Sequence, residues 1–232
     1  MICKQLFSRV YIIIVFGIIL LSGCSSYQYM SVNSYLEQNE SQEFIFENDT
    51  IQLKYSFPGE NLQITILLFN KLRQPLYLDL ERSTVVINNY QVENPFDPEG
   101  QVNFIAPLSY AKIISYPLSD QMIKLNPKDS LIEKTTLNNV GRIYSYNEET
   151  TPLYFRIILA ITANDDYSSP TFFDYSFWVS DILQTSTGPK SMKYNPSNQF
   201  YVGKTTGFGK VLGWTGVILL LFLSALLLAA PQ

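Results

Sequence analysis

Two pairs of neighbouring carboxylates are the residues of this chain best suited to acid–base chemistry. Asp79 lies two positions before Glu81, and Asp165 directly precedes Asp166. A glycoside hydrolase needs two carboxylates that flank the scissile bond, so either pair could serve in principle. No further motif accompanies either pair, and no Ser-Lys hydrolase pattern is present. We therefore expect that the carboxylates are not catalytic.

The absence of histidine narrows the chemistry further. The chain has 232 residues and no histidine, and its two cysteines are Cys3 and Cys24. Ser-His-Asp triads, Cys-His pairs and zinc sites of the usual Cys/His kind are therefore excluded. We expect a protein that is not an enzyme and that uses no cofactor or metal.

A polar run at residues 164–168 is the one candidate for cation binding. Asn164-Asp165-Asp166-Tyr167-Ser168 could offer several oxygen ligands to Ca²⁺ from one loop. The same residue types are favoured in turns, where their side chains bond the local backbone. Since strands are expected on both sides, we favour the turn.

The apolar segment at the start of the chain ends on a cysteine. Lys4 and Arg9 precede residues 10–21, which are almost entirely apolar, and Ser22-Gly23 stands immediately before Cys24. A basic start, a short apolar core and a small-residue cleavage site are the features of a secretory signal. With Leu21, these residues resemble the type II signal peptide of a bacterial lipoprotein precursor. The resemblance implies that residues 1–23 are removed and that Cys24 carries the lipid, which includes palmitate. The alternative is a buried cysteine at the end of an uncleaved anchor helix.

Removal of the signal fixes the properties of the mature chain. Cys3 is removed with the signal, so no disulfide is expected. A domain of this size can be stable through its hydrophobic core without disulfides. Loss of Lys4 and Arg9 lowers Lys and Arg from 16 to 14 against 20 Asp and Glu, so the net charge moves from −4 to −6. This charge argues against a nucleic-acid partner.

A second membrane signal lies near the other end of the sequence. Residues 211–230 carry no formal charge, and as a helix they would be about 30 Å long, the thickness of a hydrocarbon core. Trp214 suits the interface, and Lys210 marks the aqueous side. We predict a C-terminal transmembrane helix.

The two anchors leave the membrane itself in question. Export of the domain places Lys204 and Lys210 outside the cytoplasm, against the positive-inside tendency. Ser25 also differs from the aspartate associated with inner-membrane retention in some lipoproteins. Because single apolar helices normally stop in the inner membrane, we expect a domain outside the cytoplasm and favour the inner membrane over the outer membrane.

Between the anchors, the sequence indicates an all-β domain. Polar residues 24–42 are expected to form a tether with a short helix near 34–40, residues 43–183 a β-sandwich, and residues 184–210 a linker; the tether and linker could also be loosely attached strands. Short-range alternation predicts the strands 43–47, 51–57, 62–70, 76–80, 84–88, 112–116, 121–125, 142–146, 153–163 and 171–182. Asn88-Asn89 suits a tight hairpin turn.

The number and spacing of these strands favour an immunoglobulin-like β-sandwich. Residues 70–80, followed by Arg82-Ser83, resemble a strand-turn-strand pattern of uncharacterised envelope lipoproteins and of immunoglobulin-like extracellular domains. The resemblance covers about thirty residues and implies no activity and no site residues.

Aromatic residues are frequent, with 16 Tyr and 15 Phe. Most stand at strand positions, as in residues 172–178, where core packing accounts for them, and Trp178 is expected in the core. We predict a membrane-anchored lipoprotein of the cell envelope that acts as a structural or protein-interaction module with an envelope partner. The alternative is a glycan-binding module, which predicts a row of exposed tyrosines on one sheet face.

Overall fold

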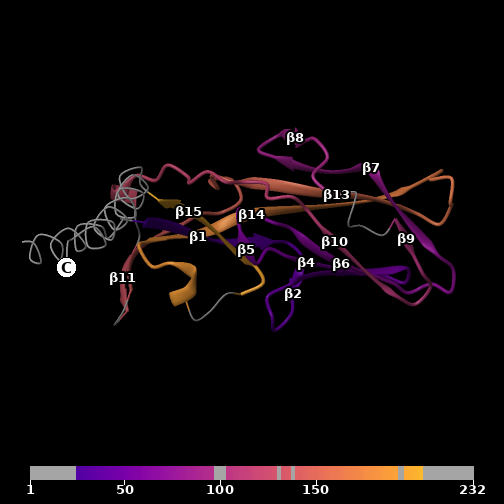
Figure 1. Cartoon of the computed structure of the whole chain (residues 1–232), viewed down its shortest axis with the longest axis horizontal. Helices are drawn as coiled ribbons and strands as arrows, with labels where there is room; N and C mark the ends of the chain where they lie inside the picture. The colour runs from indigo at the N-terminus through magenta and orange to yellow at the C-terminus, as the bar shows by residue number, and fades with distance from the viewer. Residues whose placement is uncertain (1–24, 97–102, 130–131, 137–138, 193–195, 206–232) are drawn as a thin grey trace, which may run out of the picture.

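The computed structural model describes residues 25–96, 103–129, 132–136, 139–192 and 196–205. Over these ranges the chain is mostly β-sheet, and two sheets form a sandwich-like arrangement (Figure 1). None of the helices in these ranges is long and apolar enough to cross a membrane. The predicted signal segment 1–23, the lipidation residue Cys24 and the predicted span 211–230 lie outside the described residues.

The smaller sheet is antiparallel throughout. Among the described residues it has five strands in the order β10-β6-β4-β3-β2. Their bounds are β2 Glu37–Gln38, β3 Phe44–Glu47, β4 Ile51–Ser56, β6 Thr65–Asn70 and β10 Tyr110–Ile114. Buried and partly exposed residues alternate along β6, as expected for a sheet that covers a core with one face.

The larger sheet has ten strands among the described residues. Its main path is β5-β15-β1-β14-β13-β7-β8, with β9 beside β7, and with β12 between β14 and β11. The bounds are β1 Ser25–Ser34, β5 Gly59–Glu60, β7 Leu76–Ile87, β8 Tyr90–Val92, β9 Phe104–Ile105, β11 Ile132–Thr136, β12 Asn139–Ser145, β13 Tyr154–Thr162, β14 Thr171–Thr185 and β15 Gln199–Thr205. Two short 3-10 helices, η1 (Pro127–Asp129) and η2 (Pro189–Ser191), complete the elements.

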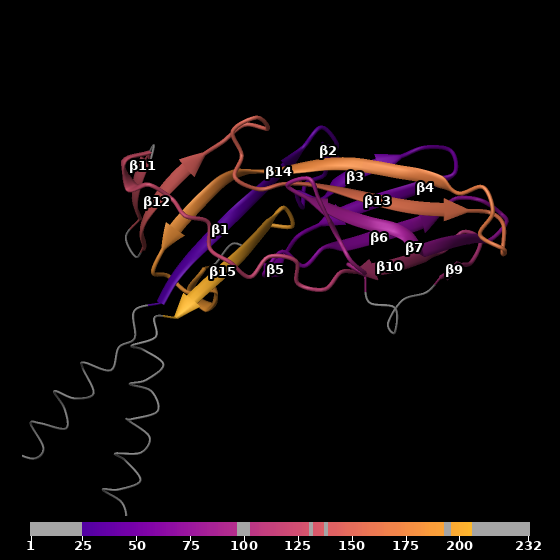
Figure 2. The same cartoon turned by 90° about the horizontal axis from the view of Figure 1, so that it is seen from above.

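Strand β14 joins the two halves of this sheet. Its first half pairs with β13 from Thr171 to Trp178, and its second half pairs with β12 from Asp181 to Thr185, while β1 lies on the opposite side. The half that contains β13, β7 and β9 faces the smaller sheet, and the half that contains β1, β15 and β12 extends beyond it (Figure 2).

Aromatic rings fill the space between the two sheets. The side chains of Phe44, Tyr55, Phe57, Phe155 and Phe177 are fully buried. The Phe177 ring centroid lies 5.2 Å from that of Phe57 and 5.5 Å from that of Phe155, within the range of favourable aromatic contacts. Burial of these rings is the main stabilising contribution to this half of the molecule.

Most of the predicted strands are present, with two differences. The predicted strands 76–80 and 84–88 form one strand, β7, with a bulge between them. Residues 121–125, predicted as a strand, are not one: the backbone of Ile123 bonds the side chain of Gln28 instead of a neighbouring strand. The hairpin at Asn88 and Asn89 is confirmed, since their φ values are 46° and 70° and β7 pairs with β8 across them.

The segments expected as tether and linker belong to the sheet. Residues 25–34 form β1 and residues 199–205 form β15, and β2 replaces the short helix expected near 34–40. The polar composition of these segments hides the residues that pack in the core, because Met30 and Phe200 are fully buried. The described β domain therefore extends beyond the predicted limits of 43–183 at both ends.

Candidate functional site

The first and last described residues lie side by side. Strands β1 and β15 are antiparallel neighbours, and Ser25 pairs with Thr205. In the sequence, Ser25 follows Cys24 directly, and five residues separate Thr205 from the predicted span 211–230. The chain therefore enters and leaves the described domain at the same end of the ten-stranded sheet (Figure 2).

A second feature lies in the other half of the molecule, where β7 bulges away from β13. Thr84 pairs with Ile158 and Asp79 pairs with Ala160, so that residues 80–83 form an excursion of β7. Ser83 stabilises this bulge, because its hydroxyl donates to the Asp79 carbonyl at 2.5 Å and accepts the Ala160 N–H at 3.0 Å. Bulges of this kind redirect side chains and are frequent beside functional sites.

Asp79 and Arg82 link the bulge to the β13–β14 turn. Asp79 is buried, with 7% of the residue exposed. Its carboxylate accepts the Arg82 backbone N–H at 3.1 Å and lies 3.3 Å from Arg82 Nε. The same guanidinium donates from Nη1 to the carbonyl of Tyr167 at 3.2 Å. One arginine thus fixes the turn against the bulge by charge-assisted bonds.

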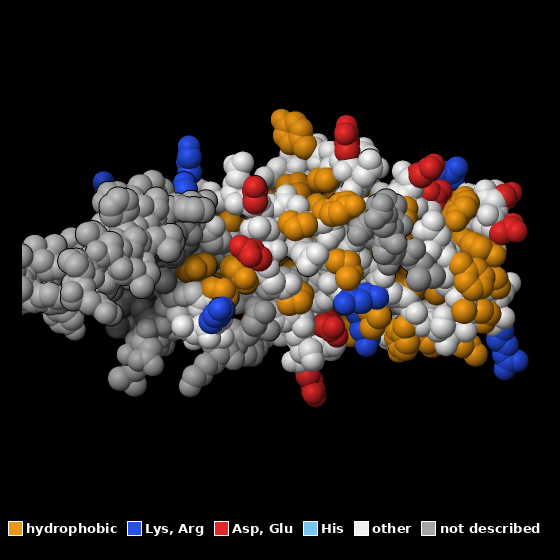
Figure 3. All heavy atoms as spheres, in the orientation of Figure 1, with side chains coloured by type: hydrophobic (Ala, Val, Ile, Leu, Met, Phe, Trp, Pro, Cys, Tyr) orange, Lys and Arg blue, Asp and Glu red, His pale blue; other side chains and the backbone are white. Residues whose placement is uncertain are grey.

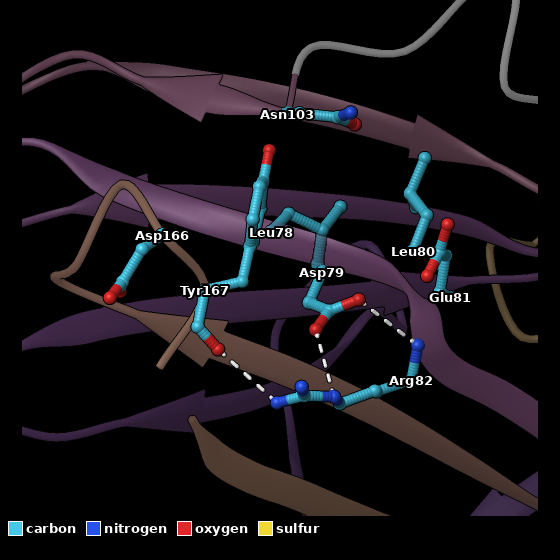
Figure 4. A pocket seen from close by; sticks show the side chains of 8 residues that line it. All are labelled: Leu78, Asp79, Leu80, Glu81, Arg82, Asn103, Asp166 and Tyr167. Atoms are coloured by element: carbon cyan, nitrogen blue, oxygen red, sulfur yellow. Dashed lines mark hydrogen bonds and ion pairs between the residues drawn. The ribbon is translucent and has the colours of Figure 1, made fainter. Parts of the chain in front are cut away.

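These residues surround a hollow of about 350 Å³, which we call the β7 hollow. It is lined by Leu78, Asp79, Leu80, Glu81, Arg82, Asn103, Asp166 and Tyr167. Figure 4 shows the side chain of Tyr167 extending toward Asn103, with the Asp79–Arg82 pair beside it. From Tyr167, rings continue to Tyr77 at 6.2 Å and on to Phe104 at 5.7 Å between centroids.

Two further hollows of similar size differ in chemistry. One, of about 370 Å³, lies between β1, β14 and the start of β15, and another, of about 360 Å³, lies beside β12 and η1. Neither lining contains an aromatic residue. The β7 hollow is the one of these three that combines a ring with an ion pair.

The fold brings three of the four carboxylates of the two predicted pairs to one site. Asp79, Glu81 and Asp166 all line the β7 hollow, whereas Asp165 does not. Asp79 is engaged by Arg82, so its carboxylate is held in an ion pair. Within the described ranges, no group of three or more Cys, Asp or Glu residues is arranged to hold a metal ion.

The run 164–168 forms a turn between β13 and β14, as favoured from the sequence. The Asn164 amide donates to the carbonyl of Ser168 at 3.1 Å, and Asp166 Oδ1 accepts the Ser168 N–H at 2.9 Å. Hydrogen bonds from Ser168 to the Asp166 carboxylate lower the pKa of this group from its ordinary value. These bonds stabilise the local backbone.

The exposed tyrosines do not form the row that the glycan-binding alternative predicts. Tyr35, Tyr90, Tyr110 and Tyr116 are exposed, but Tyr90 belongs to β8 of the larger sheet and Tyr110 to β10 of the smaller one. Tyr35 covers Trp178, whose ring lies 5.1 Å away and which is 7% exposed. The burial predicted for Trp178 is confirmed.

Hydrophobic side chains gather instead at the end of the molecule away from the chain ends, with acidic and basic side chains around them (Figure 3). Phe104, Leu108, Tyr110 and Phe172 are each about half exposed in this half of the molecule. The ring of Tyr110 packs on Phe69 at 4.5 Å. These residues are divided between the two sheets, since Phe104 and Phe172 belong to the larger sheet and Tyr110 to the smaller one. Exposed apolar side chains at one end of a domain are a frequent feature of interaction surfaces.

Sequence reasoning found three of the carboxylates around the β7 hollow but missed Arg82, Asn103 and Tyr167. The polar triplet Glu81-Arg82-Ser83, between two apolar strand segments, was a signal for the bulge. Nothing in the sequence indicates that Arg82 meets Tyr167, 85 positions away.

Comparison with known proteins gives no further assignment: no family model, no curated protein and no solved structure matches this chain.

Proposed function

We propose that this chain is a bacterial lipoprotein of the cell envelope that is held to a membrane at two points. Acylated Cys24 is the first attachment, and a helix over residues 211–230 is the second. The β domain lies outside the cytoplasm, and the inner membrane is favoured. The domain acts as a non-enzymatic structural or protein-interaction module, and its sandwich is of immunoglobulin-like character.

The pairing of Ser25 with Thr205 is the observation that supports this proposal most strongly. Two anchors whose connections leave a domain at one point can enter the same membrane surface without passing around the domain. Had the chain ends left from opposite ends of the sheet, a second anchor would have forced the domain to lie along the membrane. The adjacency therefore suits attachment by both lipid and helix.

The remaining end of the domain is then free to meet a partner. The half with β7, β9 and β10 lies away from the chain ends and carries the half-exposed Phe104, Leu108 and Tyr110 (Figures 1 and 3). The net charge of −6 expected for the mature chain argues against a nucleic acid. An envelope protein is the partner that this surface suits.

A glycan-binding module remains the second candidate. Its support is not a row of exposed tyrosines but the ring of Tyr167 beside the polar lining of the β7 hollow. Aromatic rings and directed polar groups in one concave site are the usual composition of a small-molecule site.

Labelled palmitate tests the attachment. Cells that produce the wild-type, Cys24→Ala and Cys3→Ala chains are grown with the label, and the immunoprecipitated proteins are compared. We expect incorporation in the wild type and in Cys3→Ala, and none in Cys24→Ala. Equal incorporation in the wild type and Cys24→Ala would refute lipidation at this residue.

A further inference from the structure

The β7 hollow lies where one edge of β7 has no strand beside it among the residues that the structure describes. Strand β9 pairs with Leu76 and Tyr77, and β8 pairs with residues 85–87. Among the described residues, no strand pairs with positions 79–84 on that edge. The Arg82 N–H already bonds the Asp79 carboxylate and the Asp79 carbonyl accepts from Ser83, so a ligand here would meet mainly the side chains of the lining.

Tyr167 is held in position by several contacts. Its backbone has a φ of 57°, a left-handed conformation that is uncommon for an aromatic residue. The carbonyl of Tyr167 accepts from Arg82, its N–H donates to the Asn164 carbonyl at 3.1 Å, and its ring packs edge-on against Tyr77. The ring is thus fixed beside the hollow before any ligand arrives, which lowers the entropic cost of binding.

The charges of the lining select the class of ligand. Asp79, Glu81 and Asp166 contribute three carboxylates against the single guanidinium of Arg82. An anionic ligand, such as a phosphate or a sulfated sugar, would be repelled by this excess of negative charge. Carboxylates and the Asn103 amide are instead good partners for hydroxyl groups, since they accept and donate hydrogen bonds in fixed directions.

The size of the hollow fits a small, flat, polar molecule. A volume of about 350 Å³ is at the lower end for ligand pockets, which suits one or two sugar rings. A pyranose offers an apolar C–H face to an aromatic ring and hydroxyls at its edge. The lining offers the ring of Tyr167 on one side and polar side chains on the other (Figure 4).

We propose that the β7 hollow binds a neutral saccharide, which stacks on Tyr167 and bonds through its hydroxyls to Glu81 and Asn103. This inference rests on the second candidate function above, the glycan-binding module, and assigns to it a ligand class and a site. The Asp79–Arg82 pair is a positioning element, because it holds the bulge and the Tyr167 carbonyl in place.

The experiment measures saccharide binding by the full-length protein in nanodiscs, because a maltoside detergent could compete. Cellotriose, maltotriose and triacetylchitotriose, all neutral, are titrated up to about 1 mM, a concentration that detects weak specific affinity. We expect at least one to bind. Tyr167→Ala should weaken that binding about tenfold or more, the equivalent of losing one stacking contact.

Three further variants make the result specific. Tyr167→Phe keeps the ring and should retain the affinity, and Glu81→Gln, at an exposed position, should weaken binding with no change in Tm. Tyr90→Ala removes a ring that is 79% exposed on β8, outside the hollow, and should bind as the wild type does. If Tyr167→Ala lowers Tm, its loss of binding no longer identifies the site. The proposal is then tested by whether Glu81→Gln binds the saccharide more weakly than Tyr90→Ala does.

Several outcomes would overturn the proposal. These are no binding of any of the three saccharides, equal affinity in the wild type, Tyr167→Ala and Glu81→Gln, or binding of a lysine-rich peptide in their place. Because palmitate labelling is measured separately, failure of the saccharide site leaves the attachment proposal standing. Failure of the attachment proposal likewise leaves the saccharide site standing.

Discussion

The half of the molecule near the chain ends and the half away from them are stabilised in different ways. Away from the ends, two sheets face each other across tightly packed rings that include Phe57, Phe155 and Phe177. Near the ends, one sheet continues through β1, β15 and β12, and the non-strand segment that contains Ile123 lies over it. The first half depends on burial of aromatic area. The second also buries apolar side chains, including Met30, Ile182 and Phe200, and adds polar bonds such as that between Gln28 and Ile123.

This difference relates to what each half has to do. A packed aromatic core tolerates little rearrangement, which suits a rigid support for a binding surface. The half near the ends has to receive the chain from Ser25 and return it at Thr205, so its strands are fixed at defined points. We expect mutations to have unequal effects in the two halves.

The largest expected effect is in the aromatic core. Phe177→Ala removes a ring that contacts Phe44, Tyr55, Phe57 and Phe155, and should lower the free energy of unfolding by about 3–5 kcal/mol. Guanidinium denaturation in detergent, followed by tryptophan fluorescence, measures it. Phe172→Ala, on the same strand but 55% exposed, is the control and should change stability by about 0.5 kcal/mol or less. Equal losses of unfolding free energy in the two variants would contradict the placement of Phe177 in the core.

The second effect concerns the bond that holds residues 121–125 over β1. The buried Gln28 side chain donates to the Ile123 carbonyl and accepts the Ile123 N–H, both at 2.8 Å. Gln28→Leu leaves both backbone groups without this partner and should cost about 1–3 kcal/mol. Gln184→Leu, at the position paired with Gln28 on β14, is the matched control and should cost about 0.5 kcal/mol or less. If the two substitutions cost the same, the polar contact does not stabilise this half.

The substitution of Tyr by Phe should change stability in opposite directions at Tyr55 and at Tyr29. Tyr55 is fully buried and its hydroxyl has no hydrogen-bond partner among the described residues, so Tyr55→Phe should raise the free energy of unfolding by about 1 kcal/mol. The Tyr29 hydroxyl donates to the Thr187 carbonyl at 2.9 Å, so Tyr29→Phe should lower it by about 1 kcal/mol. Thermal unfolding of both variants checks the pair, and a loss of stability in Tyr55→Phe would contradict the arrangement.

The last effect appears only in alkali. Burial raises the pKa of Tyr29 and that of Tyr175 to about 12, whereas an unfolded tyrosine titrates near 10. Above pH 10 the unfolded chain loses these protons first, so the stability they contribute is complete below pH 10 and is lost as pH rises to 12. The denaturation midpoint should fall over this interval, and less steeply in Tyr29→Phe and Tyr175→Phe. An unchanged slope in both variants would contradict the raised pKa values.

The sequence predicted the half with the packed core better than the half near the chain ends. Alternation marks β4, β6 and β13 because one face of each is buried, and Asn88-Asn89 marks a turn through its tolerance of positive φ. In β1 and β15, buried Met30 and Phe200 stand among polar residues, and local composition masks them. Their place in the sheet depends on pairing between residues more than 160 positions apart, which no local pattern encodes.

The β7 hollow was predictable only in part for the same reason. Asp79, Glu81 and Asp166 are visible as charged residues near strand ends, but their convergence depends on the bulge. The bulge depends in turn on Ser83 reaching the Ala160 N–H, 77 positions away. Arg82 and Tyr167 acquire their roles from this tertiary contact, so sequence spacing could not assign them.

One measurement tests the central claim, that both chain ends meet the membrane at the same end of the domain. Cys3 is expected to leave with the signal and Cys24 to be acylated, so a single added cysteine can carry a fluorophore. Lys204→Cys places it on β15 beside the chain end, and Asp165→Cys places it in the β13–β14 turn. Full-length protein in nanodiscs with a quencher on the lipid headgroups should show strong quenching at position 204 and little at position 165. Equal quenching at both positions, or stronger quenching at 165, would contradict the account.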